Sequence, residues 1–197
     1  MDNQISEAIK IILQGGIVIF PTDTVYGVGC KIDNEIAVKK LFELRKRPQE
    51  KATPVLVKGI SQAETYFEKV PNNIRELMIK YWPGALTIVY YCQKGLIPPL
   101  VRGGGETIGL RMPDLDITLS IIDGIGMPIL GPSANFHGSN TPKSFEELDP
   151  EFVKKVDFVV NGKTNLGVAS TVLDCTKNPF EILRQGGKII DEKDLSN

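Results

Sequence analysis

Apolar residues at helical spacing mark four amphipathic segments along this chain. In residues 5–13 they fall on one face of a helix, and Gly15 and Gly16 then provide a stop signal. The second segment begins after Asn34, a residue that can cap a helix, and ends before Pro48. Two further helices are predicted by the capping-box spacing of Ser61 to Glu64 and by the apolar pattern of residues 72–82.

Short runs rich in β-branched and aromatic residues separate the helical segments and predict strands. The run 17–20 precedes Pro21, which cannot donate to a sheet ladder and therefore ends the strand. Further strands are predicted at 54–58, 86–91, 107–111, 128–130, 158–160, 171–173 and 181–183. Because helices and strands alternate through most of the chain, we expect an α/β domain with a central sheet packed by helices.

Composition indicates one domain without a strong charge bias. The 197 residues are 42% hydrophobic, which is enough for one substantial core. The chain has 23 basic and 24 acidic residues and a formal net charge of −1. Overall charge therefore gives no sign of a nucleic-acid or membrane surface, and any anion site must be local.

Cysteine and histidine are scarce, which limits the chemistry available to the chain. The 3 cysteines are widely separated and the only histidine is His137. A disulfide framework, a zinc site or a Ser-His-Asp triad is therefore not expected. The N-terminus lacks a positive signal region, and no apolar stretch approaches membrane length. We expect a cytoplasmic, reduced protein with no membrane segment.

The segment 21–29, Pro-Thr-Asp-Thr-Val-Tyr-Gly-Val-Gly, places side-chain oxygens and glycines directly after a predicted strand. Gly27 and Gly29 allow a turn or a close approach of the backbone to a bound molecule. Two interpretations fit: the loop holds a ligand, or its threonines satisfy their own backbone as in an ordinary polar loop. Trp82 and Phe136 are expected to pack rather than to stack on a base, and residues 103–105 to form a mobile hairpin or lid tip.

Four cations cluster around Pro48 at the end of the second predicted helix: Arg45, Lys46, Arg47 and Lys51. The helix dipole and simple solvation favour cations at such a position. Pro48 also forces the chain out of the helix and can return Lys51 beside Arg47, an arrangement that suits a triphosphate. The chain contains no P-loop and no Gly-x-Gly-x-x-Gly fingerprint, so a nucleotide would bind in another way.

Seven segments in order resemble the YrdC/Sua5 family, the threonylcarbamoyl-AMP synthases. They are Pro-Thr-Asp-Thr at 21–24, Arg-Lys-Arg-Pro at 45–48, Tyr-Trp-Pro-Gly-Ala-Leu-Thr at 81–87, Ile-Gly-Leu-Arg-Met-Pro at 108–113, Gly-Pro-Ser-Ala-Asn at 131–135, Ser-Thr-Val-Leu-Asp at 170–174 and Leu-Arg-Gln-Gly at 183–186. The resemblance runs from about residue 15 to 187 and implies a twisted mixed central sheet with flanking helices and a concave basic cleft. It also implies the short, single-domain form over residues 1–197.

The resemblance assigns roles position by position. Catalytic positions are Arg45, Arg47, Ser133 and Asn135. ATP-binding positions are Arg47, Lys51, Thr107, Ser133, Thr141 and Arg184. Threonine-binding positions are Thr24, Leu56, Arg111, Gly131 and Ser170. The chain departs from the family at Arg45, where the family has lysine, at Leu56, where some members have histidine, and at Leu115, where histidine is frequent. An apolar Leu56 implies a backbone or packing contact.

What the resemblance implies is the conversion of L-threonine, bicarbonate and ATP, with Mg²⁺, to threonylcarbamoyl-adenylate and pyrophosphate. The adenylate is the donor for N6-threonylcarbamoyladenosine at position 37 of tRNA, so tRNA and the threonylcarbamoyl transferase machinery are possible partners. Two alternatives remain. One is a paralogue of this fold with a changed substrate. The other is a non-catalytic RNA-binding module that uses the patch from Arg45 to Lys51 with Tyr81 and Trp82, against which the neutral overall charge weighs.

Overall fold

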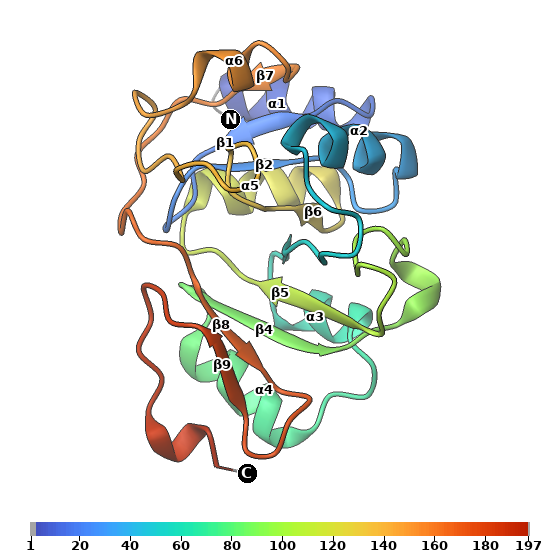
Figure 1. Ribbon diagram of the computed structural model, residues 1–197, viewed down its shortest axis with the longest axis vertical. Coiled ribbons are helices and arrows are strands. Elements are labelled where there is room, and N and C mark those ends of the chain that lie inside the picture. The colour runs from blue at the N-terminus through green and yellow to red at the C-terminus, as the bar shows by residue number, and fades with distance from the viewer. Residues whose placement is uncertain (1–2, 197) are drawn as a thin grey trace.

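The computed structural model describes residues 3–196 and contains two β-sheets, one above the other in Figure 1. The smaller sheet has the order β2-β1-β7, formed by β1 (Val18–Phe20), β2 (Gly27–Gly29) and β7 (Phe158–Val159). Strand β1 is antiparallel to β2 and parallel to β7. Helices α1 (Asn3–Leu13) and α5 (Asp116–Ile125) pack beside it through one apolar cluster, in which Ile12, Phe20 and Ile121 are buried.

The larger sheet is mixed and has the order β6-β3-β5-β4-β8-β9. Its strands are β3 (Val55–Leu56), β4 (Leu86–Tyr91), β5 (Thr107–Arg111), β6 (Ile129–Leu130), β8 (Thr171–Asp174) and β9 (Glu181–Arg184). Helices α3 (Ile60–Tyr66) and α4 (Asn72–Tyr81) cover one face of this sheet (Figure 1). The predicted α/β class, with a mixed sheet and flanking helices, is confirmed.

Alternation along the central strands leaves polar residues on the face that α3 and α4 do not cover. On β5, Ile108 and Leu110 enter the main core, so Gly109 and Arg111 point to the opposite face. A Cβ on Gly109 would lie 3.1 Å from the Thr87 side chain of β4, which places Thr87 on the same face. This uncovered face is where a ligand can approach the sheet.

Helix α2 (Glu35–Arg45) delivers the basic cluster to that face. Asn34 caps its N-terminus as predicted, because its Oδ1 accepts a hydrogen bond from the Ala37 N–H at 3.0 Å. The helix ends at Arg45, and Lys46 follows in the left-handed region with φ 53°. The chain therefore turns sharply between Arg45 and Arg47, and Lys46 points its ammonium over the Phe136 ring.

One expectation about local structure is wrong, and some elements were not predicted. Helix α3 begins at Ile60 after Gly59 and has no side-chain cap, so the capping box at Ser61 is wrong. At 103–105, Gly103 packs closely, since a Cβ there would lie 2.6 Å from the Glu50 carbonyl oxygen, but Gly104 and Gly105 are exposed, so the mobile hairpin or lid tip stays a prediction. Helix α5 and strand β2 were not predicted. The short elements η1 (Lys94–Leu96), α6 (Pro150–Val153) and η2 (Glu192–Asp194) complete the fold.

Packing explains several residues that sequence alone left ambiguous. Trp82 is buried and its indole N–H donates to the Leu86 carbonyl at 2.7 Å, which confirms a packing role. Cys30, Cys92 and Cys175 are buried and free. Within residues 3–196, no helix is long and apolar enough to cross a membrane.

Candidate functional site

A cavity of about 150 Å³ opens between the loop after β1 and the uncovered face of the larger sheet. Four arginines line it, from α2, the turn after α2, β5 and β9, and no aspartate or glutamate of the described residues does. Its lining residues are Thr22, Thr24, Val25, Gly27, Arg45, Arg47, Pro54, Thr87, Arg111, Gly131, Pro132, Ser133, Thr141, Ala169, Ser170 and Arg184. The four arginines form a local concentration of cations in a protein whose formal net charge is −1, and the predicted concave basic cleft stays a prediction.

Arg45 forms the inner wall of the cavity and is 4% exposed. Its Nε donates to the Asn135 carbonyl oxygen at 3.2 Å, and its Nη2 lies 3.4 Å from both Asn135 Oδ1 and Ser133 Oγ. Its Nη1 is buried and has no hydrogen-bond partner. Burial and, to a lesser extent, the charge of Arg47 lower the pKa of Arg45 to about 10. A buried guanidinium with an unsatisfied donor suits an anionic ligand.

Arg47 lies at the mouth of the cavity and is fixed by the turn that follows it. Its Nε donates to the Lys51 carbonyl at 3.1 Å and its Nη2 to the Ala52 carbonyl. The expected return of residue 51 to Arg47 is therefore confirmed for the backbone. The Lys51 ammonium lies 3.4 Å from His137 Nε2, and desolvation followed by Lys51, Arg47 and Arg45 lowers the pKa of His137. Positive charge is thus concentrated on this side of the cavity.

Arg111 meets an acid that does not line the cavity. Its Nη1 lies 2.7 Å from Asp23 Oδ1, and the two side chains are 5% and 4% exposed. This is the only ion pair within residues 3–196 in which both side chains are that deeply buried. Asp23 thereby links the loop after β1 to the end of β5.

Arg184 and Ser170 form the side of the cavity that belongs to β8 and β9. The Nε and Nη2 of Arg184 donate to the Ser170 carbonyl at 3.0 and 2.8 Å, and Nη2 also lies 3.3 Å from Ser170 Oγ. Desolvation and the charge of Arg111 lower the pKa of Arg184. Ser170 Oγ lies 2.8 Å from Thr87 Oγ1, so a hydroxyl pair is held between two arginines.

The two threonines of the loop at 21–29 have different surroundings, and the local-turn interpretation is confirmed for Thr22. Thr22 Oγ1 donates to the Val25 carbonyl at 2.7 Å and accepts from the N–H groups of Thr24 and Val25, so it serves mainly its own turn. Thr24 Oγ1 is 2.9 Å from Thr22 Oγ1 and lines the cavity. The local turn thus supports a hydroxyl that a ligand can reach.

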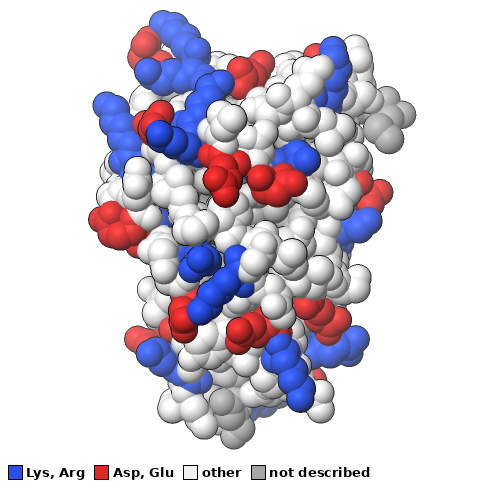
Figure 2. All heavy atoms as spheres, turned by 90° about the vertical axis from the view of Figure 1, so that its right-hand side faces the viewer, with Lys and Arg blue, Asp and Glu red and all other residues white. Residues whose placement is uncertain are grey.

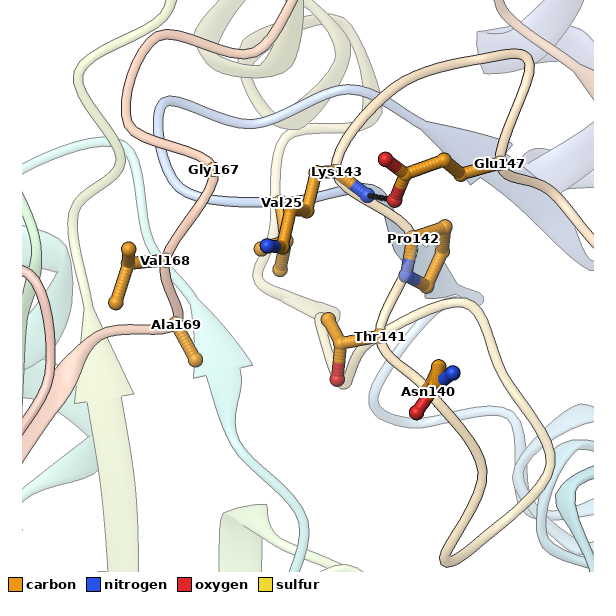
Figure 3. Close-up of a pocket in the computed structure, with 9 residues that line it drawn as sticks. All are labelled: Val25, Asn140, Thr141, Pro142, Lys143, Glu147, Gly167, Val168 and Ala169. Atoms are coloured by element: carbon orange, nitrogen blue, oxygen red, sulfur yellow. Dashed lines mark hydrogen bonds between the residues drawn. The ribbon is translucent and has the colours of Figure 1, made fainter.

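A second, larger pocket of about 760 Å³ adjoins the cavity and shares Val25, Thr141 and Ala169 with it. Figure 3 shows its two walls facing each other, with residues 140–143 on one side and residues 167–169 on the other. Lys143 N–H donates to Glu147 Oε2 at 2.9 Å at its rim. Sites for small molecules typically span roughly 300–1,000 Å³, so this pocket has room for the remainder of a nucleotide-sized ligand.

The structure brings most of the site residues expected from the sequence into the cavity and leaves four outside its lining. Asn135 is buried behind Arg45, and its Nδ2 donates to the Ser139 carbonyl at 2.7 Å. Leu56 lies beneath Gly131, since a Cβ on Gly131 would be 2.3 Å from Leu56 Cγ. Lys51 is exposed beside His137. Thr107 begins β5, roughly 13 Å along the strand from Arg111.

Two contacts in this region went unrecognised in the sequence. The hydroxyl of Thr87 is buried beside Ser170, although Thr87 is part of an otherwise apolar strand. A polar residue flanked by Leu86 and Ile88 was the available signal. Asp23 stands between two threonines, and nothing in the sequence shows that its carboxylate reaches Arg111. No group of three or more His, Cys, Asp or Glu side chains within residues 3–196 is arranged to hold a metal ion.

Comparison with known proteins identifies relatives of this chain. A threonylcarbamoyl-AMP synthase of Bacillus subtilis is 38% identical over 187 residues, which are 94% of this chain and 54% of that protein. The structure of Pyrococcus abyssi Sua5 complexed with L-threonine matches with a TM-score of 0.89 at 36% identity, over 93% of this chain and 54% of that one. The chain therefore spans about half the length of these relatives.

A relative of similar length also matches. The crystal structure of Escherichia coli YciO, named an uncharacterized protein, has a TM-score of 0.82 at 29% identity and covers 97% of this chain and 92% of that one. Residues 10–186 match the family model Sua5_yciO_yrdC, which bears the description "Telomere recombination". With nearly the whole chain inside that match, the protein belongs to the Sua5/YciO/YrdC family.

Proposed function

We propose that this domain makes L-threonylcarbamoyladenylate from L-threonine, bicarbonate and ATP and releases pyrophosphate. The observation that carries the proposal is the charge of the cavity, which four arginines and no carboxylate line. All three substrates carry anionic groups, and guanidinium groups bind carboxylate and phosphate oxygens in fixed geometry. The relatives named threonylcarbamoyl-AMP synthase and the Sua5 structure with L-threonine support the same assignment.

The reaction requires no protein nucleophile. The threonine nitrogen attacks the carbon of bicarbonate, a C–N bond forms and water leaves, which gives a carbamate. A carbamate oxygen then attacks the α-phosphorus, and the bond to the bridging oxygen breaks as pyrophosphate leaves with its electron pair. Catalysis then consists of aligning the partners and stabilising the charge that develops. The cavity lining fits this task, because it holds hydroxyls and guanidiniums and neither cysteine nor histidine.

We assign the residues on the two sides of the cavity to different substrates. We assign Thr24, Arg111 and Ser170 to L-threonine, with Arg111 facing its carboxylate. We assign Arg45, Arg47, Ser133, Thr141 and Arg184 to the nucleotide, whose nucleoside end has room in the adjoining pocket. Asn135 acts through Arg45, while Leu56 acts through Gly131. Lys51 and Thr107 lie outside the cavity, and their contribution to ATP binding rests on resemblance alone.

Magnesium enters this proposal as part of the Mg–ATP substrate. Proteins usually anchor Mg²⁺ through one or two carboxylates together with substrate phosphates. The described cavity lining has no carboxylate, and its side-chain oxygens are hydroxyls, so the residues do not build a resident metal site. In this proposal, the Mg²⁺ bound to ATP and the cavity arginines together neutralise the negative charge of the phosphates.

We extend the proposal to tRNA modification, in which a transferase uses the adenylate to form N6-threonylcarbamoyladenosine. A second candidate function is a paralogue with another substrate, which the match to YciO and the arginine at position 45 favour. The RNA-binding module has less support. Among the described residues on the face that carries α2 and the 94–105 connection, acidic side chains lie among the basic ones (Figure 2).

Substrate omission tests the proposal directly. Pyrophosphate release from Mg–ATP is measured with both L-threonine and bicarbonate, and then with each one left out. We expect release only in the complete mixture, together with an adenylate product that contains threonine. Arg47→Ala, in which release should be strongly reduced, serves as the matched control for contaminating ATPases. Release that does not depend on threonine would favour the paralogue.

A further inference from the structure

The ion pair between Asp23 and Arg111 spans the cleft between the two halves of the protein. Asp23 belongs to the loop after β1, which is part of the upper sheet in Figure 1, and Arg111 ends β5 of the lower sheet. Their charged atoms are 2.7 Å apart in a buried setting. A buried pair with this geometry is strongly coupled, because removing one partner leaves the other charge uncompensated.

Asp23 occupies only part of the hydrogen-bonding capacity of Arg111. A guanidinium has five N–H donors, and the hydrogen bond from Nη1 to Asp23 is the one that its side chain makes within residues 3–196. The Arg111 backbone is fixed separately, since its carbonyl accepts from the Val57 N–H at 2.9 Å. Because Arg111 also lines the cavity, its remaining donors are available to a ligand there.

The backbone of Asp23 holds a second wall of the site. Its carbonyl oxygen accepts hydrogen bonds from the N–H groups of Asn165 and Leu166 at 3.2 and 2.9 Å. These residues belong to the connection between β7 and β8, which continues to Ala169 and Ser170 at the cavity. Asp23 therefore connects Arg111 to the segment that leads to Ala169 and Ser170.

We propose that Asp23 is a positioning residue for amino-acid recognition: its carboxylate holds one edge of the Arg111 guanidinium so that the other donors face the carboxylate of the bound amino acid. The inference rests on the proposed function, because the substrate that it concerns is L-threonine. An acid that also lined the cavity would repel that carboxylate. Asp23 avoids this, since it lies behind the arginine and outside the lining.

Asp23→Asn tests the proposal, because it keeps the shape and one acceptor but removes the charge that orients Arg111. We expect the KM for L-threonine to rise roughly tenfold or more, the size of one charge-assisted contact, while the KM for ATP stays nearly constant. Asp23→Glu, which keeps the charge, should recover part of the loss. Calorimetry should show the same ranking of L-threonine affinity, with wild type binding most tightly, Asp23→Glu more weakly and Asp23→Asn most weakly.

Two controls separate positioning from general support of the loop. Thr118 is buried, and its Oγ1 donates to the Pro21 carbonyl at 2.5 Å, so Thr118→Val weakens the same loop without touching Arg111. This variant should lower the thermal midpoint and leave the KM for threonine unchanged. In an Arg111→Gln background, Asp23→Asn should add no further loss of threonine affinity.

The outcomes distinguish this inference from the proposed function. A wild-type protein whose pyrophosphate release ignores threonine overturns the function and the inference together. A threonine-dependent wild type whose Asp23→Asn variant binds threonine normally overturns the inference alone. The same holds if Asp23→Asn and Thr118→Val shift the KM for threonine and for ATP equally. If Asp23→Asn does not fold, Asp23→Glu is compared with wild type instead. We then expect a changed KM for threonine, and an unchanged KM would contradict the inference.

Discussion

Arg45 is held by Asn135 through both its backbone and its side chain. The Nε of Arg45 donates to the Asn135 carbonyl oxygen at 3.2 Å, and its Nη2 donates to Asn135 Oδ1 at 3.4 Å. This arrangement fixes the plane of a buried guanidinium and leaves Nη1 as an unsatisfied donor. Asn135 therefore lies behind the cavity and positions a guanidinium that lines it.

Two substitutions of Arg45 should separate the effect of its positive charge on activity from the effect of its planar guanidinium group. Arg45→Lys keeps a cation at a position where the family has lysine, so we expect activity within about tenfold of wild type. Arg45→Met removes the charge and leaves the acceptors of Asn135 unpaired, so we expect a loss of about a hundredfold or more. Steady-state pyrophosphate release checks both. Equal losses in the two variants would contradict a mainly electrostatic role.

Arg47 and Lys46 are adjacent cations with opposite surroundings. Arg47 lines the cavity, whereas the Lys46 ammonium lies 5.4 Å from the centre of the Phe136 ring. We expect Arg47→Ala to reduce kcat/KM for ATP roughly tenfold or more, the effect of one charge-assisted phosphate contact, and Lys46→Ala to change it little. Similar kinetic losses in the two variants would show that the assignment of the turn after α2 is wrong.

Thr24 should contribute to the choice of threonine over valine. Its hydroxyl bonds to Thr22 Oγ1 and keeps further capacity, whereas Ser170 Oγ already has contacts with Thr87 and Arg184. Valine would leave this capacity unused, which predicts about tenfold discrimination against it. Thr24→Val should reduce the difference in affinity between threonine and valine. Binding of both amino acids to wild type and variant by calorimetry measures it, and equal wild-type affinities would remove Thr24 from the pocket.

Gly131 is required because Leu56 fills the space where a side chain would be. The Cβ of Gly131→Ala would lie 2.3 Å from Leu56 Cγ, so we expect a loss of about 1–3 kcal/mol in the free energy of unfolding from overpacking. In a Leu56→Ala background, Gly131→Ala should lower the free energy of unfolding much less. Urea unfolding of the wild type, the two single variants and the double variant measures this coupling. Additive effects would mean that Leu56 is not the obstacle.

Alkaline pH should destabilise the fold through its buried thiols. Burial raises the pKa of Cys30 from 9.0 to about 12. The unfolded chain therefore loses this proton near pH 9, while the folded chain keeps it, so the folded state binds more protons in that window. Stability should fall as pH rises from 9 to about 12, by at most about 1.4 kcal/mol per pH unit for this thiol. Urea unfolding of Cys30→Ala should show a shallower decline, and an unchanged slope would refute the assignment.

Strands and helices with strong local signals were predictable because their patterns are short-range. The strands β4 and β5 have the predicted bounds, and Asn34 caps α2 as expected. The signal at Ser61 failed because the N-cap of α3 lies two residues earlier, at Gly59. Strand β2 was missed because two of its three residues are glycines, which have little intrinsic strand preference, and the strand depends on pairing with β1.

By itself, the sequence determined that the chain is an α/β domain, that its cations near Pro48 suit an anion, and which segments resemble a known family. These conclusions follow from periodicity, capping and residue order, which are properties of neighbouring residues. Only the tertiary structure decided that Arg45, Arg111 and Arg184 share one cavity, that Asn135 and Leu56 lie behind it, and that Asp23 pairs with Arg111. Those contacts join residues far apart in the chain, and their positions depend on strand order and loop packing, which local patterns do not encode.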